Sequence, residues 1–433
     1  MTQSDLIIIG AGPGGYRAAE LAARQGLKVT IFEEGHVGGT CLNVGCIPTK
    51  TFVHSSTFSE AVERQQQVVG QLRAGVEQLL SHPGITLVRQ RATFVDAHTV
   101  AHHPSSAEET GAGSFSAPNI IIATGSSPKL LPIVDATAVD SNLSEGTGRG
   151  PRVVTSTGML QLTEQPRRLC IIGAGVIGME FASVFQRFGT EVTVIEYLKE
   201  CLPMVDADVA KRLRKLLEKR GISFHMKTAV ESLDDIDADA ILMATGRKPN
   251  VQDDFANAGF AYDDRRGITV DDHFQTTVPG IYAIGDVNGR QMLAHAAEMQ
   301  ARIVVDSILG HPLPPAPAGG YPMPAAIFTQ PEAACVGPTE EMLKQEGTPY
   351  ECRKAFWRAN GKALAMGETE GMLKLFSEPD GGRILGCHAF GAHAADLIQE
   401  ASVLMCCQAT VRQLRYMVHI HPTLSEILQA AAE

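Results

Sequence analysis

Residues 6–15 read Leu6-Ile7-Ile8-Ile9-Gly10-Ala11-Gly12-Pro13-Gly14-Gly15. The four apolar residues are typical of a buried parallel strand, and the glycine pattern GxGxxG follows them directly. Helical periodicity then continues through Arg24, so backbone amides at the start of this helix can bind a pyrophosphate. A second apolar run at residues 29–32 ends on Glu33, whose carboxylate is placed to accept hydrogen bonds from ribose hydroxyls. The stretch therefore predicts a dinucleotide-binding unit.

The same pattern occurs a second time along the chain. Residues 169–172 are apolar and lead into a second GxGxxG at residues 173–178, and a further strand ends on Glu196. The interval from first glycine to acid is the same in both copies, Gly10 to Glu33 and Gly173 to Glu196. Each copy closes on an apolar strand and an Ala-Thr-Gly, at residues 123–125 and 244–246. Two copies predict two bound dinucleotides.

Between the strands of the first copy lies a short segment with two cysteines, Cys41 and Cys46. In an ideal helix residues five apart are roughly 8–9 Å apart at Cα, beyond the ~7 Å limit for a disulfide. A bridge therefore needs a distorted turn, which Gly45 could provide, and such a strained bridge would be easily reduced. The alternatives are an incomplete metal site or two buried thiols. We predict no metal, because no second Cys/His pair at ligand spacing lies nearby.

The whole segment, GGTCLNVGCIPTK at residues 38–50, resembles the active-site motif of the flavoprotein disulfide reductases, the class I pyridine nucleotide-disulfide oxidoreductases. Within that class it is most similar to dihydrolipoamide dehydrogenases, and the resemblance covers nearly the whole chain. It implies an α/β fold with two Rossmann-like dinucleotide-binding domains, for FAD and NAD, and a C-terminal α+β interface domain that forms a homodimer. The implied domains are FAD-binding at 1–148, NAD-binding at 149–266, a return to the FAD domain at 267–315, and dimerisation at 316–433. A Gly-rich stretch at residues 144–151 marks the first boundary by composition.

The resemblance also implies which residues bind each cofactor. Because the cysteine pair follows the first copy, that copy is expected to hold FAD and the second NAD. The FAD residues are expected to be Gly10, Gly12, Gly15, Glu33, Thr40, Lys50, Ala123, Thr124, Gly125, Gly285, Asp286, Ala294 and His295. The NAD residues are expected to be Gly173, Gly175, Gly178, Glu196 and Gly246.

The acid of the second copy bears on the choice of nicotinamide cofactor. The Glu196 carboxylate accepts hydrogen bonds from a 2′-hydroxyl but repels a 2′-phosphate, and residues 197–200 contain no arginine. This favours NAD over NADP. The alternative is that Glu196 is a solvated loop acid.

The catalytic residues implied by the resemblance lie in three segments. The first holds the redox disulfide of Cys41 and Cys46, and Lys50 one turn later. The second holds Glu180, which pairs with that lysine in the family. The third, Val418 to Glu426, supplies a base, because imidazole titrates near the working pH. The catalytic set is expected to be Cys41, Cys46, Lys50, Glu180, His421 and Glu426, the last two acting on the disulfide of the other subunit. His419 is expected to be structural.

Bulk properties exclude several function classes. A net charge of −11 over 433 residues argues against nucleic acid and against an anionic membrane surface as partners. No apolar run reaches 18 residues, so we expect no membrane span. The N-terminus has no basic segment before its first strand, so we expect no signal peptide. Nine cysteines, an odd number, favour a reducing cytoplasm with mostly free thiols.

The sequence also departs from the family in two places. An amphipathic helix expected from Val53 to Leu80 looks shortened, and residues 230–240 leave no room for the hairpin that relatives carry. Cys406 and Cys407 lie in a helical pattern and are expected in the core.

The predicted function is FAD-dependent oxidation of protein-bound dihydrolipoamide with reduction of NAD to NADH. Alternatives are an NADH-dependent reductase of another disulfide, a diaphorase or NADH oxidase, and a non-catalytic flavin-binding subunit. The sequence does not identify the carrier protein that presents the lipoyl group.

Overall fold

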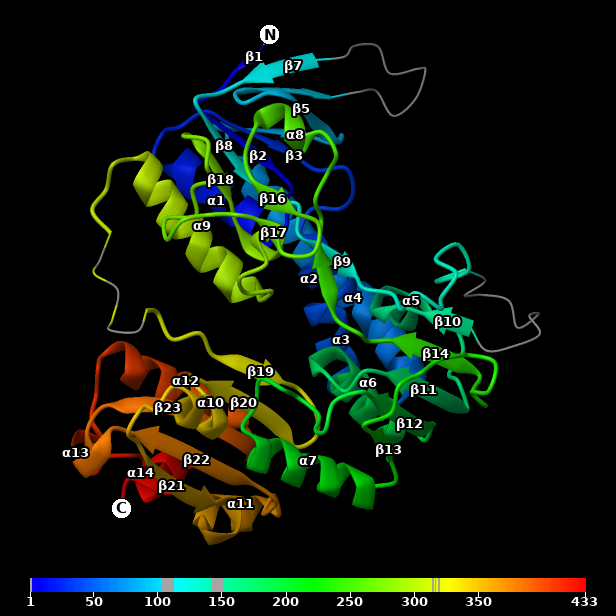
Figure 1. The fold of residues 1–433 in the computed structure, drawn as a ribbon, viewed down its shortest axis with the longest axis vertical. Helices are drawn as coiled ribbons and strands as arrows, with labels where there is room; N and C mark the ends of the chain where they lie inside the picture. The colour runs from blue at the N-terminus through cyan, green and yellow to red at the C-terminus, as the bar shows by residue number, and fades with distance from the viewer. Residues whose placement is uncertain (1, 103–112, 142–151, 314, 316, 318–319) are drawn as a thin grey trace. The chain divides into compact units, whose positions relative to one another are not determined.

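The computed structural model describes residues 2–102, 113–141, 152–313, 315, 317 and 320–433 (Figure 1). Their contacts divide the chain into two compact units: a first unit of residues 1–54, 59–129 and 246–314, and a second unit of residues 55–58, 130–245 and 315–433. The composition boundary at 144–151 lies outside the described residues, as do positions 314, 316, 318 and 319 near the last boundary. The four-domain division therefore stays a prediction. Among the described helices, none combines the length and apolarity that crossing a lipid bilayer requires.

The first unit is built on a five-stranded sheet in which all strands are parallel. Its spatial order is β18 (Ile281–Ala283), β8 (Asn119–Ile122), β2 (Leu6–Ile9), β3 (Val29–Phe32) and β4 (Ile85–Val88). The central strands are apolar at almost every position because both of their faces are covered.

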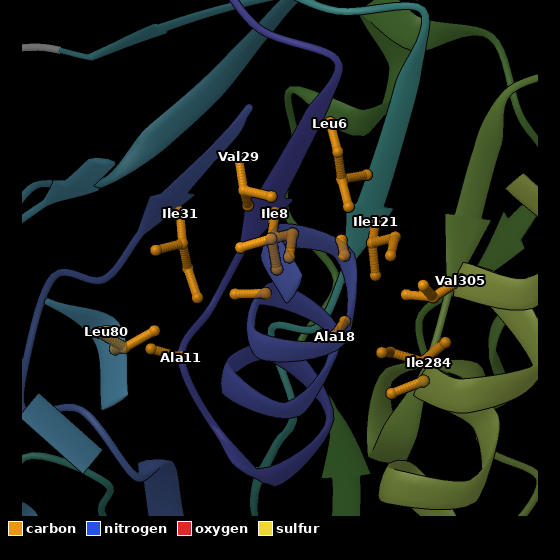
Figure 2. Close-up of a cluster of buried hydrophobic side chains, with 14 of the residues drawn as sticks. Leu6, Ile8, Ala11, Ala18, Val29, Ile31, Leu80, Ile121, Ile284 and Val305 are labelled. Carbon is orange, nitrogen blue, oxygen red and sulfur yellow. The ribbon is translucent and has the colours of Figure 1, made fainter. Parts of the chain in front are cut away.

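Alternate residues of β2 pack into two different hydrophobic clusters, one on each face of the sheet. Leu6 and Ile8 belong to a buried cluster with residues of helices α1 (Pro13–Arg24) and α9 (Ala294–Ile308), and Figure 2 shows Ile121 of β8 beside them and Val305 of α9 beyond it. Ile7 and Ile9 point to the opposite face and pack in a cluster with aromatic residues such as Phe94 and Phe255. The sheet is thus a middle layer, and its strand ends carry the glycine turns.

The second unit contains a second parallel five-stranded sheet. Its order is β10 (Arg152–Val154), β14 (Ala240–Met243), β11 (Arg168–Ile172), β12 (Glu191–Glu196) and β13 (Ser223–Met226). Strands β14, β11, β12 and β13 repeat the order of β8, β2, β3 and β4, which confirms the internal repeat predicted from the glycine motifs. The connection from β13 to β14 contains no strand, in agreement with the predicted loss of the hairpin.

The C-terminal part of the second unit is an antiparallel sheet covered by helices. The order is β19 (Ala325–Ile327), β20 (Glu332–Val336), β23 (Ile384–Gly391), β22 (Met372–Ser377) and β21 (Glu351–Phe356). The buried side of this sheet packs against α12 (Ala394–Cys406) and α14 (Glu426–Ala432) around Trp357. The predicted α/β class with a separate C-terminal α+β part is confirmed.

The remaining elements are shorter or connect these layers. The strands are β1 (Thr2–Gln3), β5 (Ala92–Asp96), β6 (Thr99–His102), β7 (Gly113–Ser116), β9 (Ser126–Pro128), β15 (Arg247–Pro249), β16 (Tyr262–Asp263) and β17 (Gly267–Ile268). The helices are α2 (Gly39–Val44), α3 (Cys46–Val53), α4 (Phe58–Leu80), α5 (Ser156–Gln161), α6 (Val176–Arg187), α7 (Ala207–Lys219), α8 (Phe255–Ala258), α10 (Glu340–Gln345), α11 (Gly361–Met366) and α13 (Val411–Leu414).

Two expectations about helices were wrong. The helix expected from Val53 begins only at Phe58, because residues 55–58 pack with α6: the Phe58 ring contacts Phe185, and the Ser55 carbonyl accepts a hydrogen bond from Arg187. Cys406 and Cys407 are exposed and not in the core. They lie at the end of α12, beyond its buried residues.

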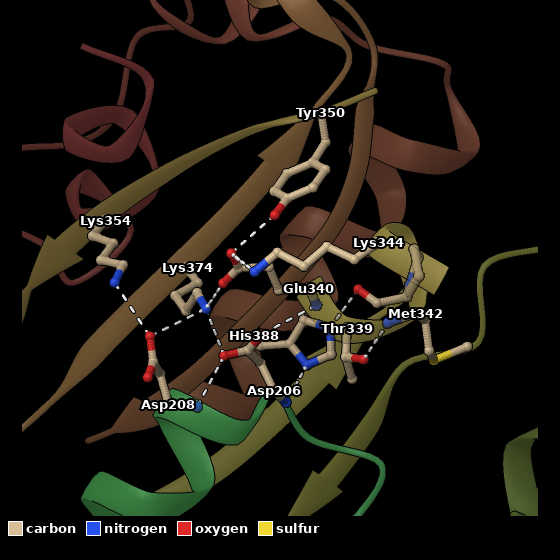
Figure 3. A network of polar contacts seen from close by, with 11 residues as sticks. Asp206, Asp208, Thr339, Glu340, Met342, Lys344, Tyr350, Lys354, Lys374 and His388 are labelled. Carbon is tan, nitrogen blue, oxygen red and sulfur yellow. Dashed lines mark hydrogen bonds and ion pairs between the residues drawn. The ribbon is translucent and has the colours of Figure 1, made fainter. Parts of the chain in front are cut away.

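A buried lysine joins the two parts of the second unit (Figure 3). Lys374 Nζ, with 1 % of the side chain exposed, lies 2.7 Å from Asp206 Oδ1, 2.6 Å from Glu340 Oε2 and 3.4 Å from Asp208 Oδ2. Burial alone would lower the pKa of Lys374, but hydrogen bonds to Asp206 and Glu340 outweigh it and raise the pKa. The Asp206 amide donates to His388 Nδ1, so this imidazole is held as an acceptor at that atom.

We expect Lys374→Met to destabilise the second unit by about 3–5 kcal/mol, because it leaves the buried Asp206 carboxylate without its cation. Urea unfolding, monitored through the fluorescence of Trp357, measures the change in the free energy of unfolding. The matched control is Lys354→Met, which removes an exposed lysine 3.3 Å from Asp208 and is expected to cost below about 1 kcal/mol. Equal losses in the two variants would contradict the role of the buried cation.

Candidate active site

The two cysteines of the redox segment lie on either side of a break between two helices. Helix α2 ends at Val44 and α3 begins at Cys46, with Gly45 between them at φ −142° and ψ −112°. A Cβ on Gly45 would lie 2.8 Å from the carbonyl oxygen of Thr40, so only glycine allows this close approach. The distorted turn expected from the cysteine spacing is therefore present.

This break brings the two sulfurs into contact. Both cysteines are thiols here, Cys46 exposed and Cys41 half-buried, and their side chains are hydrogen-bonded to each other. The hydrogen bond to Cys46 and burial raise the pKa of the Cys41 thiol, while the charge of Lys50 lowers it. The two cysteine side chains thus form a close dithiol pair at the break between α2 and α3.

Asn43, which the sequence analysis did not single out, fixes the segment between the cysteines. Its Nδ2 donates to the carbonyl oxygens of Val37, at 3.0 Å, and Gly39, at 2.9 Å. Its Oδ1 accepts from Arg73 Nε at 2.9 Å, which ties α2 to the long helix α4. The only sequence signal for this role is the position of Asn43 between the two cysteines.

The first glycine turn has the close backbone contacts that the GxGxxG pattern predicts. Gly10 has φ +102° and a Cβ there would clash with the carbonyl oxygen of Ala123, while a Cβ on Gly15 would clash with the carbonyl oxygen of Gly10. Glu33 Oε2 accepts a hydrogen bond from the Ala11 amide at 2.8 Å, so the acid is held against the turn. Gly12 caps α1 at its N-terminus.

The second glycine turn has the same construction. Gly173 has φ +108° and approaches the carbonyl oxygen of Ala244, and Gly178 approaches Gly173. Glu196 Oε2 accepts from the Ala174 amide at 2.6 Å, and Oε1 accepts from the Leu198 amide at 2.7 Å. Gly175 caps α6, and a Cβ placed on it would meet no atom within 4 Å. This backbone faces open space that can receive a phosphate group.

The Ala-Thr-Gly of the first copy is held in place by hydrogen bonds to other segments of the first unit. Ala123 donates its amide to Ile9, and the Thr124 hydroxyl donates to the Asn250 carbonyl at 2.9 Å. The Asn250 amide donates to Gly125 at 2.9 Å. Gly246, from the equivalent Ala-Thr-Gly, has φ +99° and belongs to the first unit.

Two of the residues expected to bind FAD, Gly285 and Asp286, lie in a 3-10 turn, η1 (Gly285–Asn288), next to the start of α9. The Gly285 amide donates to Gln300 at 2.8 Å, and the Asp286 carboxylate accepts from the Ser126 hydroxyl. Ala294 and His295 are the first two residues of α9, with His295 exposed. Thr40 is also exposed, in the first turn of α2. All these positions lie in the first unit with the cysteines.

Lys50 and Glu180 belong to different units. Lys50 lies in α3 of the first unit, and Glu180 is buried in α6 of the second. Glu180 Oε1 accepts a hydrogen bond from the Phe328 amide at 2.9 Å. Their pairing stays a prediction.

The two C-terminal histidines are in contrasting environments. His419, with 7 % of its side chain exposed, pairs through Nε2 with Glu400 at 2.8 Å, which fits the expected structural role. His421, with 79 % exposed, pairs through Nδ1 with Glu426 Oε1 at 2.9 Å. The Thr423 amide, followed by His421, lowers the pKa of Glu426. Glu426 therefore orients an imidazole whose Nε2 points away from that acid.

Comparisons with known proteins identify relatives of the whole chain. A family model described as pyridine nucleotide-disulphide oxidoreductase matches residues 4–301, and the model of the dimerisation domain of the same family matches residues 323–432. Mitochondrial dihydrolipoyl dehydrogenase from Pisum sativum is 35% identical over an alignment of 476 residues, covering 99% of this chain and 91% of the relative. Dihydrolipoyl dehydrogenase from Bacillus subtilis is 35% identical, covering 100% and 96%. Among solved structures, the HOCl-induced flavoprotein disulfide reductase RclA from Escherichia coli has a TM-score of 0.89 and 30% identity, covering 99% of both chains.

Proposed function

Because this chain belongs to the pyridine nucleotide-disulphide oxidoreductase family, we propose that it is a dihydrolipoyl dehydrogenase, oxidising protein-bound dihydrolipoamide and reducing NAD to NADH. Enzymes of this family use FAD and NAD(H). The residues present fit both groups, since each glycine turn exposes a helix N-terminus beside a fixed carboxylate. The observation that carries the proposed chemistry is the contact between Cys41 and Cys46 across the Gly45 break.

The chain's own residues account for the thiol steps. His421 Nε2 takes the proton of one substrate thiol, while Glu426 holds the opposite ring nitrogen and stabilises the imidazolium. The resulting thiolate attacks Cys41 of the oxidised pair, the Cys41–Cys46 bond breaks, and Cys46 leaves as a thiolate. The second substrate thiol then attacks the mixed disulfide, releasing lipoamide and the Cys41 thiol. Bound FAD supplies the two-electron route by which the dithiol is reoxidised and NAD reduced.

We further propose a homodimer in which His421 serves the cysteine pair of the other subunit. The C-terminal segment around His421 exposes three large apolar side chains, with 88 % of Tyr416, 98 % of Val418 and 79 % of Ile420 accessible in the single chain. An exposed apolar cluster beside a catalytic base suits a surface covered by a second copy. We also propose a cytoplasmic location, because a reducing compartment keeps the seven cysteines outside the redox pair as free thiols.

The test is initial-rate NADH formation from NAD and free dihydrolipoamide. Turnover that depends on both substrates would support the lipoyl assignment. Turnover of artificial dyes with NADH, without turnover of dihydrolipoamide, would contradict it and point to another disulfide.

One specific observation favours a second candidate, an NADH-dependent reductase of a different disulfide. The alignments with dihydrolipoyl dehydrogenases are longer than this 433-residue chain, so these relatives contain segments that it lacks, and RclA, a flavoprotein disulfide reductase, matches the fold of this chain with a TM-score of 0.89. A panel of small disulfides with NADH as donor separates the two candidates.

Glu196 is expected to set the preference for NAD over NADP. Its carboxylate is fixed by two backbone amides, so it cannot turn away from a 2′-phosphate without breaking them. We expect Glu196→Gln to raise kcat/KM for NADP relative to NAD by about tenfold, since it removes a like charge while keeping the shape. Glu191→Gln, at the exposed start of the same strand, is the control and is expected to leave the ratio unchanged. An unchanged ratio in Glu196→Gln would contradict the assignment.

A further inference from the structure

The segment between Glu196 and helix α7 holds the second glycine turn from both sides. Ala174, the second residue of that turn, donates its amide to Glu196 Oε2 at 2.6 Å and accepts the Leu202 amide on its carbonyl oxygen at 2.9 Å. Leu202 is fully buried and has φ +50°, a left-handed conformation that is sterically unfavourable for a leucine. Such a conformation persists only where the surrounding contacts enforce it.

The first glycine turn is held in the same way, but by a glycine. Glu33 accepts the Ala11 amide, and the Gly38 amide donates to the Ala11 carbonyl oxygen at 2.8 Å. Gly38 has φ +97°, which glycine adopts without a steric penalty. The second copy has a leucine in the corresponding role, so its turn depends on contacts that hold Leu202 from outside.

Asp206, four residues after Leu202, lies at the other end of this segment. The Val205 amide donates to the Leu202 carbonyl oxygen at 2.8 Å, so the chain turns directly into α7, which Asp206 caps. Before Leu202, Glu200 Oε1 pairs with Arg214 Nε of α7 at 2.6 Å. The segment is thus attached to α7 on both sides of Leu202, and a shift at the start of that helix would reach the glycine turn.

Two neighbouring strands of the C-terminal sheet hold Asp206 in place (Figure 3). Lys374 on β22 and His388 on β23 are direct partners in the strand register, and both are fully buried. The Asp206 amide donates to His388 Nδ1 at 3.0 Å, and the Asp206 carboxylate pairs with Lys374 Nζ at 2.7 Å. The same carboxylate accepts the Glu340 amide at 3.2 Å. His388 Nε2 lies 3.0 Å from the Pro338 carbonyl oxygen, so the ring is neutral and carries its proton on Nε2.

We propose that His388 and Lys374 are positioning residues of the NAD site: by holding Asp206 they fix the segment that clamps the second glycine turn. This inference rests on the binding of NAD at that turn, which is part of the proposed function, and it does not require the lipoyl substrate. Through this route the C-terminal sheet contributes to nucleotide affinity, although neither side chain belongs to the glycine turn.

The test is calorimetric titration of NAD into the oxidised holoprotein, without dihydrolipoamide, so that no turnover occurs. We expect His388→Leu to raise the Kd for NAD by about tenfold, because the turn then adopts its binding conformation for only about a tenth of the time. In NADH-dependent dye reduction the same variant should show a raised KM for NADH with kcat nearly unchanged. His388→Asn should restore most of the affinity, because its side-chain oxygen can replace Nδ1 as the acceptor.

Leu375→Ala is the matched control for a loss of stability alone. Leu375 follows Lys374 on β22, is fully buried, and packs in the cluster around Trp357, on the opposite face of the sheet. We expect this variant to lower the urea unfolding midpoint, as His388→Leu does, but to leave the Kd for NAD unchanged. A Kd that rises equally in both variants, or in neither, would overturn the proposal.

Asp206→Asn is the second variant, for the case that His388→Leu does not fold. It keeps the size of the side chain and the amide hydrogen bond to His388, but it removes the charge that Lys374 neutralises. We expect a smaller rise in the Kd for NAD, and an unchanged Kd in this variant would overturn the proposal.

The titration also separates this proposal from the proposed substrate. An enzyme that shows the expected Kd changes but does not oxidise dihydrolipoamide would keep the role of His388 and lose the lipoyl assignment. An enzyme that oxidises dihydrolipoamide with the same NAD affinity in wild type and His388→Leu would lose only the role of His388. Wild-type protein that does not bind NAD would overturn both.

Discussion

Cys41→Ser is expected to reduce dihydrolipoamide oxidation by about 10³-fold or more, because no disulfide is then available for the substrate thiolate to attack. The serine hydroxyl is nearly the size of the thiol, and the Gly45 break that places it does not depend on sulfur. The loss should therefore come from the chemistry and not from the fold. Initial-rate NADH formation measures it, with the unfolding midpoint recorded in parallel.

The electron path from NADH to artificial dyes is expected to survive in the same variant, since it does not need the cysteine pair. The matched control is Cys352→Ser, which replaces another half-buried cysteine, on strand β21 of the second unit. We expect full dihydrolipoamide turnover in that variant. Equal rates for Cys41→Ser and Cys352→Ser would remove the cysteine pair from the mechanism.

The parts of the fold that the sequence predicts well depend on local constraints. A strand, a GxGxxG turn and a helix of the first copy recur in the second with the same spacing to Glu33 and Glu196, and both acids hydrogen-bond the turn. The conflict between helix geometry and a disulfide at five-residue spacing likewise predicts a break, and Gly45 is where it occurs.

The parts that the sequence does not predict depend on partners far along the chain. Nothing local in the sequence pairs Asn43 with Arg73, or Ser126 with Arg247, because sheet register and helix docking bring them together. The start of α4 at Phe58 has the same origin, since the aromatic contact with Phe185 draws residues 55–58 toward α6. Cys406 and Cys407 continue an apolar helical pattern past its buried residues, and periodicity alone does not show where the covering sheet ends.

His421→Gln is expected to lower dihydrolipoamide oxidation by about 10²–10⁴-fold near pH 7, the usual contribution of a positioned general base. Glutamine can still hydrogen-bond Glu426 but cannot accept a proton from the substrate thiol. His311→Gln is the matched control, because His311 is another exposed histidine paired with a carboxylate, 3.3 Å from that of Asp306. NADH-dependent dye reduction should be unchanged in both variants.

The pH dependence of this loss separates a base from a residue that only shapes the surface. As the pH rises, free dihydrolipoamide forms thiolate without help, so the rate deficit of His421→Gln should shrink steadily between pH 7 and pH 10. A residue needed only for the dimer surface, as Val418 and Ile420 are proposed to be, would give a deficit that does not change with pH. Rates of wild type and variant measured across that range decide between the two, and a constant ratio would contradict the assignment of His421 as the base.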